Sequence, residues 1–182
     1  VSTALSARNG LLIRNRAAFE TARNIQALVF DKTGTLTMGE FGVTDVVLFD
    51  DTYSRNELLN YAAAVESRSE HPIARGIVES SENPYEVRDF NAIAGKGAEG
   101  YVHDKPVQTV SPGYARENDM LPVDSRIEEL TGEGKTVVMV IIDGKSAGAV
   151  ALADKIRPES KAAVQQLKDK GIQCMMLIGD NE

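Results

Sequence analysis

Ile25-Gln-Ala-Leu-Val-Phe30 leads directly into Asp31-Lys-Thr-Gly-Thr-Leu-Thr37 near the start of this chain of 182 residues. The apolar run contains no turn-forming residue, which is typical of a strand buried in a parallel sheet. Gly34 then indicates a tight turn, so the strand is predicted to end at Asp31. Because ligands bind at the carboxyl edge of an open α/β sheet, Asp31 is the first candidate functional residue.

The other end of the chain repeats this pattern. A predicted helix ends at Gly171, and the apolar run 172–178 then leads into Gly179-Asp180. Because the carboxyl ends of parallel strands meet at one edge of a sheet, Asp31 and Asp180 are expected to lie close together.

The middle of the chain has a different pattern of predicted secondary structure. Ser54 and Glu57 form a capping box at the start of a predicted helix, and Asp143-Gly144 is a predicted hairpin turn. Strand-like runs are expected at residues 85–90, 100–103, 107–110, 136–142 and 146–152. Together these signals predict an α/β protein, in which an α+β domain on an antiparallel sheet is inserted into a parallel-sheet domain. The expected parts are a helical lead-in over 1–24, the parallel-sheet domain over 25–42 and 153–182, and the inserted domain over 43–152.

The composition is that of a soluble globular protein, with 42% hydrophobic and 26% charged residues. A formal net charge of −7 argues against nucleic acid as a partner, since nucleic-acid-binding proteins carry a basic footprint. No apolar stretch approaches the roughly 18–20 residues that a membrane span requires. Cys174, the single cysteine, lies in an apolar run and is expected to be a buried thiol in a reducing compartment.

Four arginines set the N-terminal segment apart from the acidic remainder of the chain. They stand at positions 8, 14, 16 and 23, in a predicted helix that Asn9-Gly10 is expected to weaken or break. Two interpretations are open. The arginines form the solvated face of a helix, or they belong to a juxtamembrane segment that meets anionic lipid headgroups.

The segment that follows the first strand can carry phosphoryl-transfer chemistry. A carboxylate such as that of Asp31 can attack a phosphoryl group and form an acyl phosphate. The attack needs positive charge and hydrogen-bond donors around the phosphoryl oxygens, which a metal ion, Lys32 and the backbone N–H groups of the turn can supply. The hydroxyls of Thr33, Thr35 and Thr37 add further donors.

The complete run Asp31–Thr37 resembles the phosphorylation signature of P-type ATPases, which belong to the haloacid-dehalogenase-like superfamily. The resemblance implies that Asp31 is the phosphorylated nucleophile and that Mg²⁺ is bound by its carboxylate and by the backbone carbonyl of Thr33. The implied catalytic residues are Asp31, Lys32 and Thr33, and the implied phosphate site comprises Thr35, Gly179 and Asp180.

Thr33 bears on the choice between a transport ATPase and a phosphatase. In the soluble phosphatases of this superfamily, the residue two positions after the nucleophile is a second Asp that acts as a general acid and base. A threonine hydroxyl cannot take a proton from water at neutral pH, so an acyl phosphate at Asp31 is expected to live longer. This favours a transport ATPase, with a soluble phosphatase as the alternative.

Two motifs in the inserted region indicate a nucleotide site. Ser69-Glu-His-Pro-Ile-Ala74 and Gly95-Lys-Gly-Ala-Glu-Gly100 together resemble the adenine-binding site of heavy-metal (type IB) P-type ATPases. In that family a histidine packs on the adenine, a glutamate accepts a hydrogen bond from the purine amino group, and glycines let the backbone approach the nucleotide. The resemblance implies ATP as the ligand, bound by Glu66, His71, Gly95 and Gly97.

Three further segments are similar to the copper-exporting branch of the family, namely Ser111–Tyr114, Ala151–Pro158 and Cys174–Leu177. The resemblance implies that ATP hydrolysis through an aspartyl phosphate drives copper export, with copper bound by membrane helices outside this chain. This chain would then lie on the cytoplasmic face of an integral membrane protein. Ala7–Arg14 also resembles the segment that leaves the last core membrane helix, which favours the juxtamembrane interpretation.

Two features depart from the family pattern. Ile178 replaces a threonine whose hydroxyl donates to the phosphoryl group, and the loss of one such donor costs about 2–4 kcal/mol of transition-state stabilisation. The chain stops at Glu182, before a conserved lysine and a Gly-Asp motif, so the phosphorylation domain is expected to be truncated. We therefore expect this chain to bind ATP weakly and not to complete the reaction cycle. Besides the transport ATPase and the soluble phosphatase, a non-catalytic nucleotide-binding module is a third hypothesis.

Overall fold

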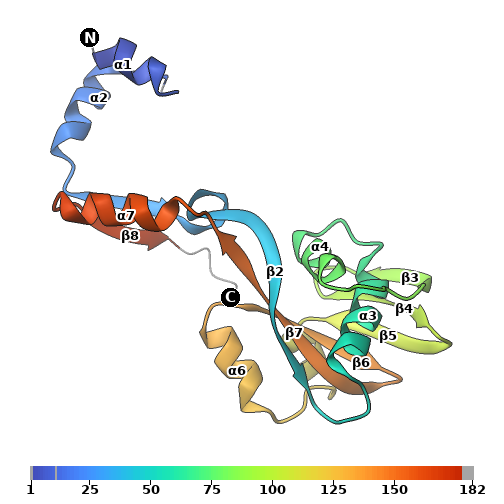
Figure 1. The fold of residues 1–182 in the computed structure, drawn as a ribbon. Helices are drawn as coiled ribbons and strands as arrows, with labels where there is room; N and C mark the ends of the chain where they lie inside the picture. Colours follow the sequence, from blue (N-terminus) through green and yellow to red (C-terminus); the bar gives the residue numbers. More distant parts are fainter. Residues whose placement is uncertain (1, 11, 178–182) are drawn as a thin grey trace. The chain divides into compact units, whose positions relative to one another are not determined.

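The computed structural model describes residues 2–10 and 12–177, and its chain forms two compact units. The first unit comprises residues 1–36 and 157–182, and the second comprises residues 37–156. The chain passes into the second unit after Leu36 and returns at Arg157, so the second unit is an insertion in the first (Figure 1). The predicted insertion of a domain with an antiparallel sheet into a domain with a parallel sheet is thereby confirmed.

The first unit contains a parallel pair of strands, as the sequence predicts. β1 (Ala27–Asp31) pairs in parallel with β8 (Gln173–Leu177), and Asp31 is the last residue of its strand. α7 (Ser160–Asp169) precedes β8 and packs against it (Figure 1). Gly171 follows the helix with a φ of +78°, a conformation that favours glycine after a helix end.

The N-terminal lead-in is broken, as expected. It consists of α1 (Ser2–Arg8), α2 (Arg16–Thr21) and the short 3-10 turn η1 (Ala22–Asn24). Gly10 adopts a φ of +76°, which ends the first helix. Asn15 caps the second helix, because its side chain accepts a hydrogen bond of 3.0 Å from the backbone N–H of Ala18.

The predicted burial of the strand before Asp31 and of the Cys174 thiol is wrong for the part of the chain that the structure describes, and β8 is also largely exposed. The exposed fraction is 56% for Val29, 50% for Met176 and 63% for Leu177. Cys174 is half-buried instead of buried, and its Sγ lies 3.7 Å from the carbonyl oxygen of Ile172. The physical reason is that two described strands with one packed helix cannot cover both faces of the sheet.

The second unit is built on a six-stranded antiparallel sheet with the order β2-β7-β6-β5-β4-β3. The strands are β2 (Thr37–Leu48), β3 (Arg88–Ile93), β4 (Gly97–Val102), β5 (Lys105–Val110), β6 (Thr136–Ile142) and β7 (Lys145–Ile156). The five strand-like runs of the sequence correspond to β3 through β7. The sequence analysis did not predict β2, whose pairing with β7 is interrupted by register shifts and involves a partner at the far end of the unit.

Helices cover both faces of this sheet. β6 shows the two layers, because alternate side chains of a strand point to opposite faces. Val138, Val140 and Ile142 share a core with α3 (Arg55–Glu66) and α4 (Pro72–Glu79). Val137, Met139 and Ile141 share the second core with α5 (Pro112–Glu117) and α6 (Ser125–Gly132). The predicted antiparallel α+β insert is thereby confirmed.

Local sequence signals also behave as predicted in this unit. The capping box is present: Ser54 Oγ accepts from the backbone N–H of Glu57, and the Glu57 carboxylate accepts from the backbone N–H of Ser54. Asp143 and Gly144 both have positive φ values, 52° and 73°, as a tight hairpin turn requires.

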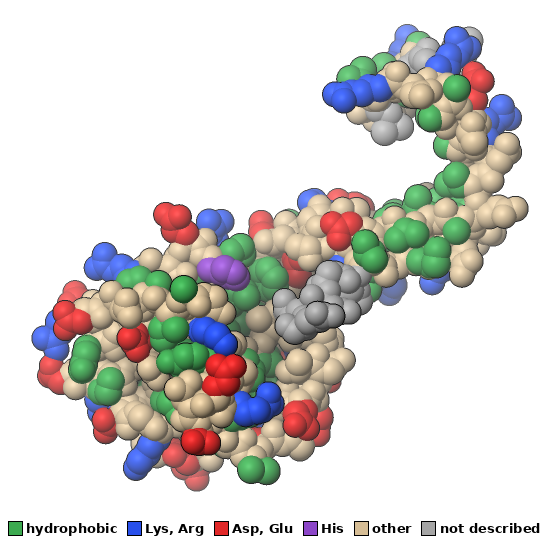
Figure 2. Space-filling view, turned by 180° about the vertical axis from the view of Figure 1, so that it is seen from behind, with side chains coloured by type: hydrophobic (Ala, Val, Ile, Leu, Met, Phe, Trp, Pro, Cys, Tyr) green, Lys and Arg blue, Asp and Glu red, His purple; other side chains and the backbone are tan. Residues whose placement is uncertain are grey.

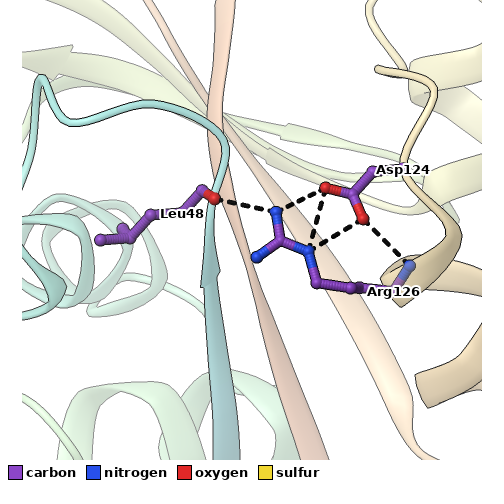
Figure 3. A network of polar contacts seen from close by, with 3 residues as sticks. All are labelled: Leu48, Asp124 and Arg126. Atoms are coloured by element: carbon purple, nitrogen blue, oxygen red, sulfur yellow. Dashed lines mark hydrogen bonds and ion pairs between the residues drawn. The ribbon is translucent and has the colours of Figure 1, made fainter.

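A polar network ties α6 to the end of β2 (Figure 3). Arg126 Nη2 donates to the carbonyl oxygen of Leu48 at 3.1 Å and to Asp124 Oδ2 at 2.6 Å. Asp124 also caps the helix, since its Oδ1 accepts from the backbone N–H of Arg126 at 3.0 Å. The network therefore fixes one end of the helical layer to the edge strand.

The predicted domain boundaries at 42/43 and 152/153 fall inside β2 and β7, and both strands belong entirely to the second unit. The pairing of Thr37 with Ile156 and of Leu48 with Gly148 holds the two strands together along their length. The functional assignment of these segments stays a prediction. Among the described residues, none of the helices is long and apolar enough to cross a membrane.

Candidate functional site

Asp31 lies at the carboxyl end of β1, where the sequence analysis placed it. Its side chain is exposed, and a turn over residues 32–36 follows at once. Gly34 adopts a φ of +78° within this turn, whereas Thr33 keeps an extended conformation with φ −77° and ψ 124°. A carboxylate in this position is open to attack a group that approaches from solvent.

The N-terminal end of α7 supports this turn. Ser160 Oγ and the backbone N–H of Arg157 both donate to the carbonyl oxygen of Leu36, at 2.8 and 3.0 Å. The Arg157 guanidinium donates to the carbonyl oxygen of Gly34 at 3.3 Å. These positioning contacts join segments far apart in the sequence, and the sequence analysis missed them. A local signal for this end of the helix is present in Arg157-Pro158-Glu159, because proline is favoured near the first position of a helix.

The remaining predicted residues of this site fall into three groups. Lys32 is half-buried, and Thr33 and Thr35 are exposed on the same turn as Asp31. The expectation for Thr37 is wrong, because its buried hydroxyl donates its proton to Asp154 Oδ2 at 2.5 Å and is not available to a phosphoryl group. Ile178, Gly179 and Asp180 lie outside the described residues.

The second unit contains a cavity of about 580 Å³, and all four predicted nucleotide-binding residues line it. Glu66 ends α3, His71 is the N-cap of α4, Gly95 lies in the turn between β3 and β4, and Gly97 is the first residue of β4. On the face drawn in Figure 2, acidic and basic side chains are interspersed over the molecule. Positive charge in the cavity wall comes from Arg68 and Lys96.

Glu66 ends α3 and is 8% exposed. Burial raises the pKa of its carboxyl group, because the charged form loses water, while a hydrogen bond from Thr109 and the proximity of His71 act to lower the pKa. Because few water molecules reach a buried carboxylate, it can accept a hydrogen bond from the amino group of a ligand with little competition from solvent.

His71 is the N-cap of α4, with Pro72 at the first helical position. Its Nδ1 accepts a hydrogen bond of 3.3 Å from the backbone N–H of Ile73, which fixes the orientation of the imidazole ring. The imidazole is exposed and lines the cavity. Helix capping thus holds the ring in a fixed place, with its surface accessible to a flat aromatic ligand.

The two glycines of the nucleotide motif serve different needs. Gly95 has a φ of +69°, and a Cβ at this position would meet no atom within 4 Å, so open space lies beside it. Gly97 has a φ of +146°, and its Cβ would lie 2.0 Å from the carbonyl oxygen of Thr109. Gly95 can therefore admit a ligand, whereas Gly97 is required by the close approach of β4 to β5.

Lys96, Thr109 and Ser111 also line the cavity and are among the lining residues that were not predicted as site residues. The backbone N–H of Ser111 donates to the carbonyl oxygen of Lys96 at 2.9 Å, which holds the glycine turn against the start of α5. Lys96 Nζ forms an ion pair with Glu117 at 3.2 Å. In the sequence, Thr109 stands out as a hydroxyl-bearing residue at a buried position of a strand, where an apolar residue is usual.

Comparison with known proteins places this geometry in a family. Residues 25–182 match the family described as haloacid dehalogenase-like hydrolase. The chain is 54% identical to the copper-exporting P-type ATPase B of Archaeoglobus fulgidus, covering 100% of this chain and 26% of that protein. It is 37% identical to the copper-exporting P-type ATPase B of Enterococcus hirae, covering 99% of this chain and 25% of that protein. The chain thus spans about a quarter of the length of these curated relatives.

Similar solved structures are also of P-type ATPases. The chain is similar to a zinc-transporting PIB-type ATPase in its E2.Pi state, with a TM-score of 0.84, 34% identity, and coverage of 98% of this chain and 30% of that one. It is also similar to the catalytic domain of the CPx-ATPase CopB-B, with a TM-score of 0.72, 28% identity, and coverage of 99% of this chain and 64% of that one. The similarity to P-type ATPases that the sequence motifs indicate is confirmed. The chain belongs to the haloacid dehalogenase-like hydrolases.

Proposed function

We propose that the chain is the nucleotide-binding and phosphorylation region of a copper-exporting P-type ATPase. The second unit binds ATP, and the first carries the residue that accepts the phosphoryl group. The observation that carries this proposal is the cavity of the second unit, where Glu66, His71 and the glycine turn from separate elements converge. The complete signature at the end of β1 supports it from the other unit.

In the nucleotide site, the imidazole of His71 packs on the adenine ring, and the Glu66 carboxylate accepts from the 6-amino group. Gly95 lets the backbone approach the ligand, since no atom stands within 4 Å of where its side chain would be. Gly97 does not need to contact the ligand, because its role is to allow the close approach of β4 to β5 that holds the Gly95 turn in place. Lys96 supplies positive charge near the polyphosphate.

At the phosphorylation site, the carboxylate of Asp31 attacks the γ-phosphorus of ATP, one of its oxygens forms the new O–P bond, and ADP leaves with the electron pair of the broken bond. Lys32 and the hydroxyl of Thr35 stabilise the negative charge on the transferring group. Gly179 and Asp180 are proposed to complete the phosphate site. Because position 33 carries a threonine, no carboxylate activates water from that position, and the aspartyl phosphate persists long enough for transport.

The oxygen donors at this site fit Mg²⁺. The exposed carboxylate of Asp31 and the backbone carbonyl of Thr33 are hard oxygen ligands, which Mg²⁺ prefers together with water and phosphate oxygens. The bound ion would neutralise phosphate charge during transfer. The chain's own residues provide the nucleophile and hold the turn.

Copper as the transported ion follows from the names of the most similar curated relatives. One similar solved structure is named as a zinc-transporting PIB-type ATPase, whereas the curated relatives are named for copper. We propose that copper binds to membrane helices elsewhere in the protein and that this region lies on the cytoplasmic face. The lead-in over 1–24 would connect it to the membrane, with the phosphorylation domain in the remainder of the first unit, residues 25–36 and 157–182, and the nucleotide-binding domain in the second unit, residues 37–156.

ATP titration of the 182-residue chain, followed by backbone NMR, tests the proposal. We expect shifts at His71, Gly95 and neighbouring residues, and a weaker affinity in the variants Glu66→Gln and His71→Ala. Glu82→Gln is the matched control, because Glu82 lines a separate cavity of about 210 Å³ in the same unit. Shifts that are absent from the cavity residues, or equal losses in all three variants, would refute a nucleotide site here.

A further inference from the structure

Lys96 stands between the two glycines of the nucleotide motif and lines the nucleotide cavity, but its ammonium group contacts a residue from outside the cavity wall. Its Nζ lies 3.4 and 3.2 Å from the two carboxylate oxygens of Glu117. Glu117 is the last residue of α5, and it is not one of the residues that line the cavity. A cation at the predicted ligand site is therefore paired with an anion beside that site.

The backbones that carry these two side chains are tied together through Ser111. The carbonyl oxygen of Lys96 accepts a hydrogen bond of 2.9 Å from the backbone N–H of Ser111, and the backbone N–H of Lys96 donates to the carbonyl oxygen of Ile93 at 2.9 Å. Ser111 is also the N-cap of α5, since its Oγ accepts from the backbone N–H of Tyr114 at 3.2 Å. The glycine turn and the helix that carries Glu117 are thus fixed to each other, and a change of partner at Lys96 needs movement of side chains alone.

The ion pair itself is accessible to solvent and weak. The exposed fraction of the side chain is 42% for Lys96 and 64% for Glu117. Exposed pairs contribute little to stability, because water and salt screen the attraction and two long side chains lose freedom. The flexible stem of a lysine lets its ammonium group change partner, and a polyphosphate offers several negative charges where a glutamate offers one. Phosphate is therefore the stronger partner for this cation.

We propose that Lys96 exchanges partners when ATP binds: its ammonium group leaves the carboxylate of Glu117 and pairs with the polyphosphate, so that Glu117 competes with the phosphates and lowers the affinity for ATP. This inference rests on the nucleotide site proposed above. The contacts of His71 and Glu66 with adenine do not involve the exchange. The competition therefore acts on nucleotides that carry phosphates and leaves adenosine unaffected.

The charges of the cavity wall make this exchange matter. Besides Lys96, the charged side chains that line the cavity are those of Arg68, Glu66 and Glu70. Two basic and two acidic side chains thus lie in the wall, and one of the two basic ones is paired with Glu117. Removing the charge of Glu117 makes the surroundings of the phosphates more positive without changing any residue that contacts the nucleotide.

The experiment compares ATP with adenosine in a double-mutant cycle. Glu117→Gln removes the negative charge and keeps the shape, Lys96→Met removes the positive charge and keeps the stem, and the double variant combines the two changes. Glu82→Gln removes the same charge at a separate cavity and controls for the net charge of the chain. Dissociation constants for the 182-residue chain are measured by backbone NMR titration at low and high salt, and the same spectra check that each variant is folded.

Glu117→Gln should strengthen ATP binding about two- to fivefold at low salt, because an exposed ion pair no longer has to be broken. Lys96→Met should weaken ATP binding, since a cation near the phosphates is lost. In the Lys96→Met background, Glu117→Gln should have no further effect, because its action passes through Lys96. Adenosine should bind equally to all variants, and the differences for ATP should shrink at high salt.

Four results would overturn the exchange while the nucleotide site itself stands. They are ATP binding by Glu117→Gln that equals the wild type, a gain that Glu82→Gln reproduces, an equal gain in the Lys96→Met background, and an equal gain for adenosine. A wild type that binds neither ligand overturns the site and this inference together.

The side-chain carboxyl carbon shift of Glu117 gives a second readout that follows the ion pair directly. In the wild type this shift should move on addition of ATP and stay in place on addition of adenosine. In Lys96→Met, ATP should leave it nearly unchanged, because the pair is already absent. A Glu117 shift that does not respond to saturating ATP in the wild type would contradict the exchange of partners.

Discussion

Replacing either glycine of the nucleotide motif by alanine should separate a structural requirement from a ligand requirement. At Gly97 the new Cβ would lie 2.0 Å from the carbonyl oxygen of Thr109 and 2.8 Å from Cα of Val110, both backbone atoms. Relief requires the paired strands to move apart, and overpacking of this kind costs about 1–3 kcal/mol. The φ of +146° adds backbone strain of about 1–3 kcal/mol. We expect Gly97→Ala to lower the free energy of unfolding by about 2–6 kcal/mol.

Gly95→Ala is the matched control. Its Cβ meets no atom within 4 Å, so the cost is that of a left-handed residue, about 1–2 kcal/mol. The added methyl group should nevertheless weaken ATP binding, because it occupies the space through which the nucleotide approaches the backbone. At this position the effect on binding should therefore exceed the effect on stability.

Urea denaturation followed by tyrosine fluorescence is suited to this comparison. The chain has five tyrosines and no tryptophan, and every tyrosine lies within residues 37–156, so the signal reports on the second unit alone. The slope of the transition should be unchanged, with the midpoint of Gly97→Ala far below that of Gly95→Ala. Equal midpoints, or a greater loss in Gly95→Ala, would refute the assignment of Gly97 to strand packing.

Three further predictions concern contacts outside the cavity. Ser160→Ala removes the 2.8 Å hydrogen bond to the carbonyl oxygen of Leu36. We expect this to lower the free energy of local opening of the Asp31 turn by about 1 kcal/mol and so to speed amide hydrogen exchange there. An unchanged exchange rate would contradict a role for this contact. Arg126→Ala breaks the network in Figure 3 and should lower the urea midpoint by an amount equivalent to about 1 kcal/mol, whereas Arg126→Lys should recover only part of it. Lys135 lowers the pKa of Asp45 by hydrogen bonding, so this contribution to stability is present above pH 3.8 and is lost as the pH falls through the lowered pKa. The stability difference between the wild type and Lys135→Met should accordingly close on acidification, and a constant difference would contradict the pairing.

Signals that are local in the sequence predicted the structure well. The capping box at Ser54, the hairpin turn at Asp143-Gly144 and the strand that ends at Asp31 each depend on a few neighbouring residues. The family motifs likewise identified four residues that line one cavity. In these cases the chemistry of adjacent side chains fixes the backbone, and a short window of sequence contains the necessary information.

Contacts between distant segments were not predictable in this way. The support of the Asp31 turn by Ser160 and the pairing of β2 with β7 both join parts far apart in the chain. Burial of β1 was overestimated, because an apolar run indicates that a strand can be covered and does not show what covers it. The different requirements of Gly95 and Gly97 also emerge only from three-dimensional distances.

The pairing of Thr37 with Ile156 means that the second unit begins and ends at adjacent positions on neighbouring strands. Asp154 secures this junction, since its carboxylate accepts from the hydroxyl of Thr37 at 2.5 Å and from the backbone N–H of Gly39 at 2.9 Å. A segment with neighbouring ends can be excised, exchanged or replaced by a short loop without stretching the chain that flanks it. The second unit is therefore a self-contained insert, and we expect that homologous inserts can be exchanged at residues 37 and 156 to test whether the proposed nucleotide preference moves with the insert.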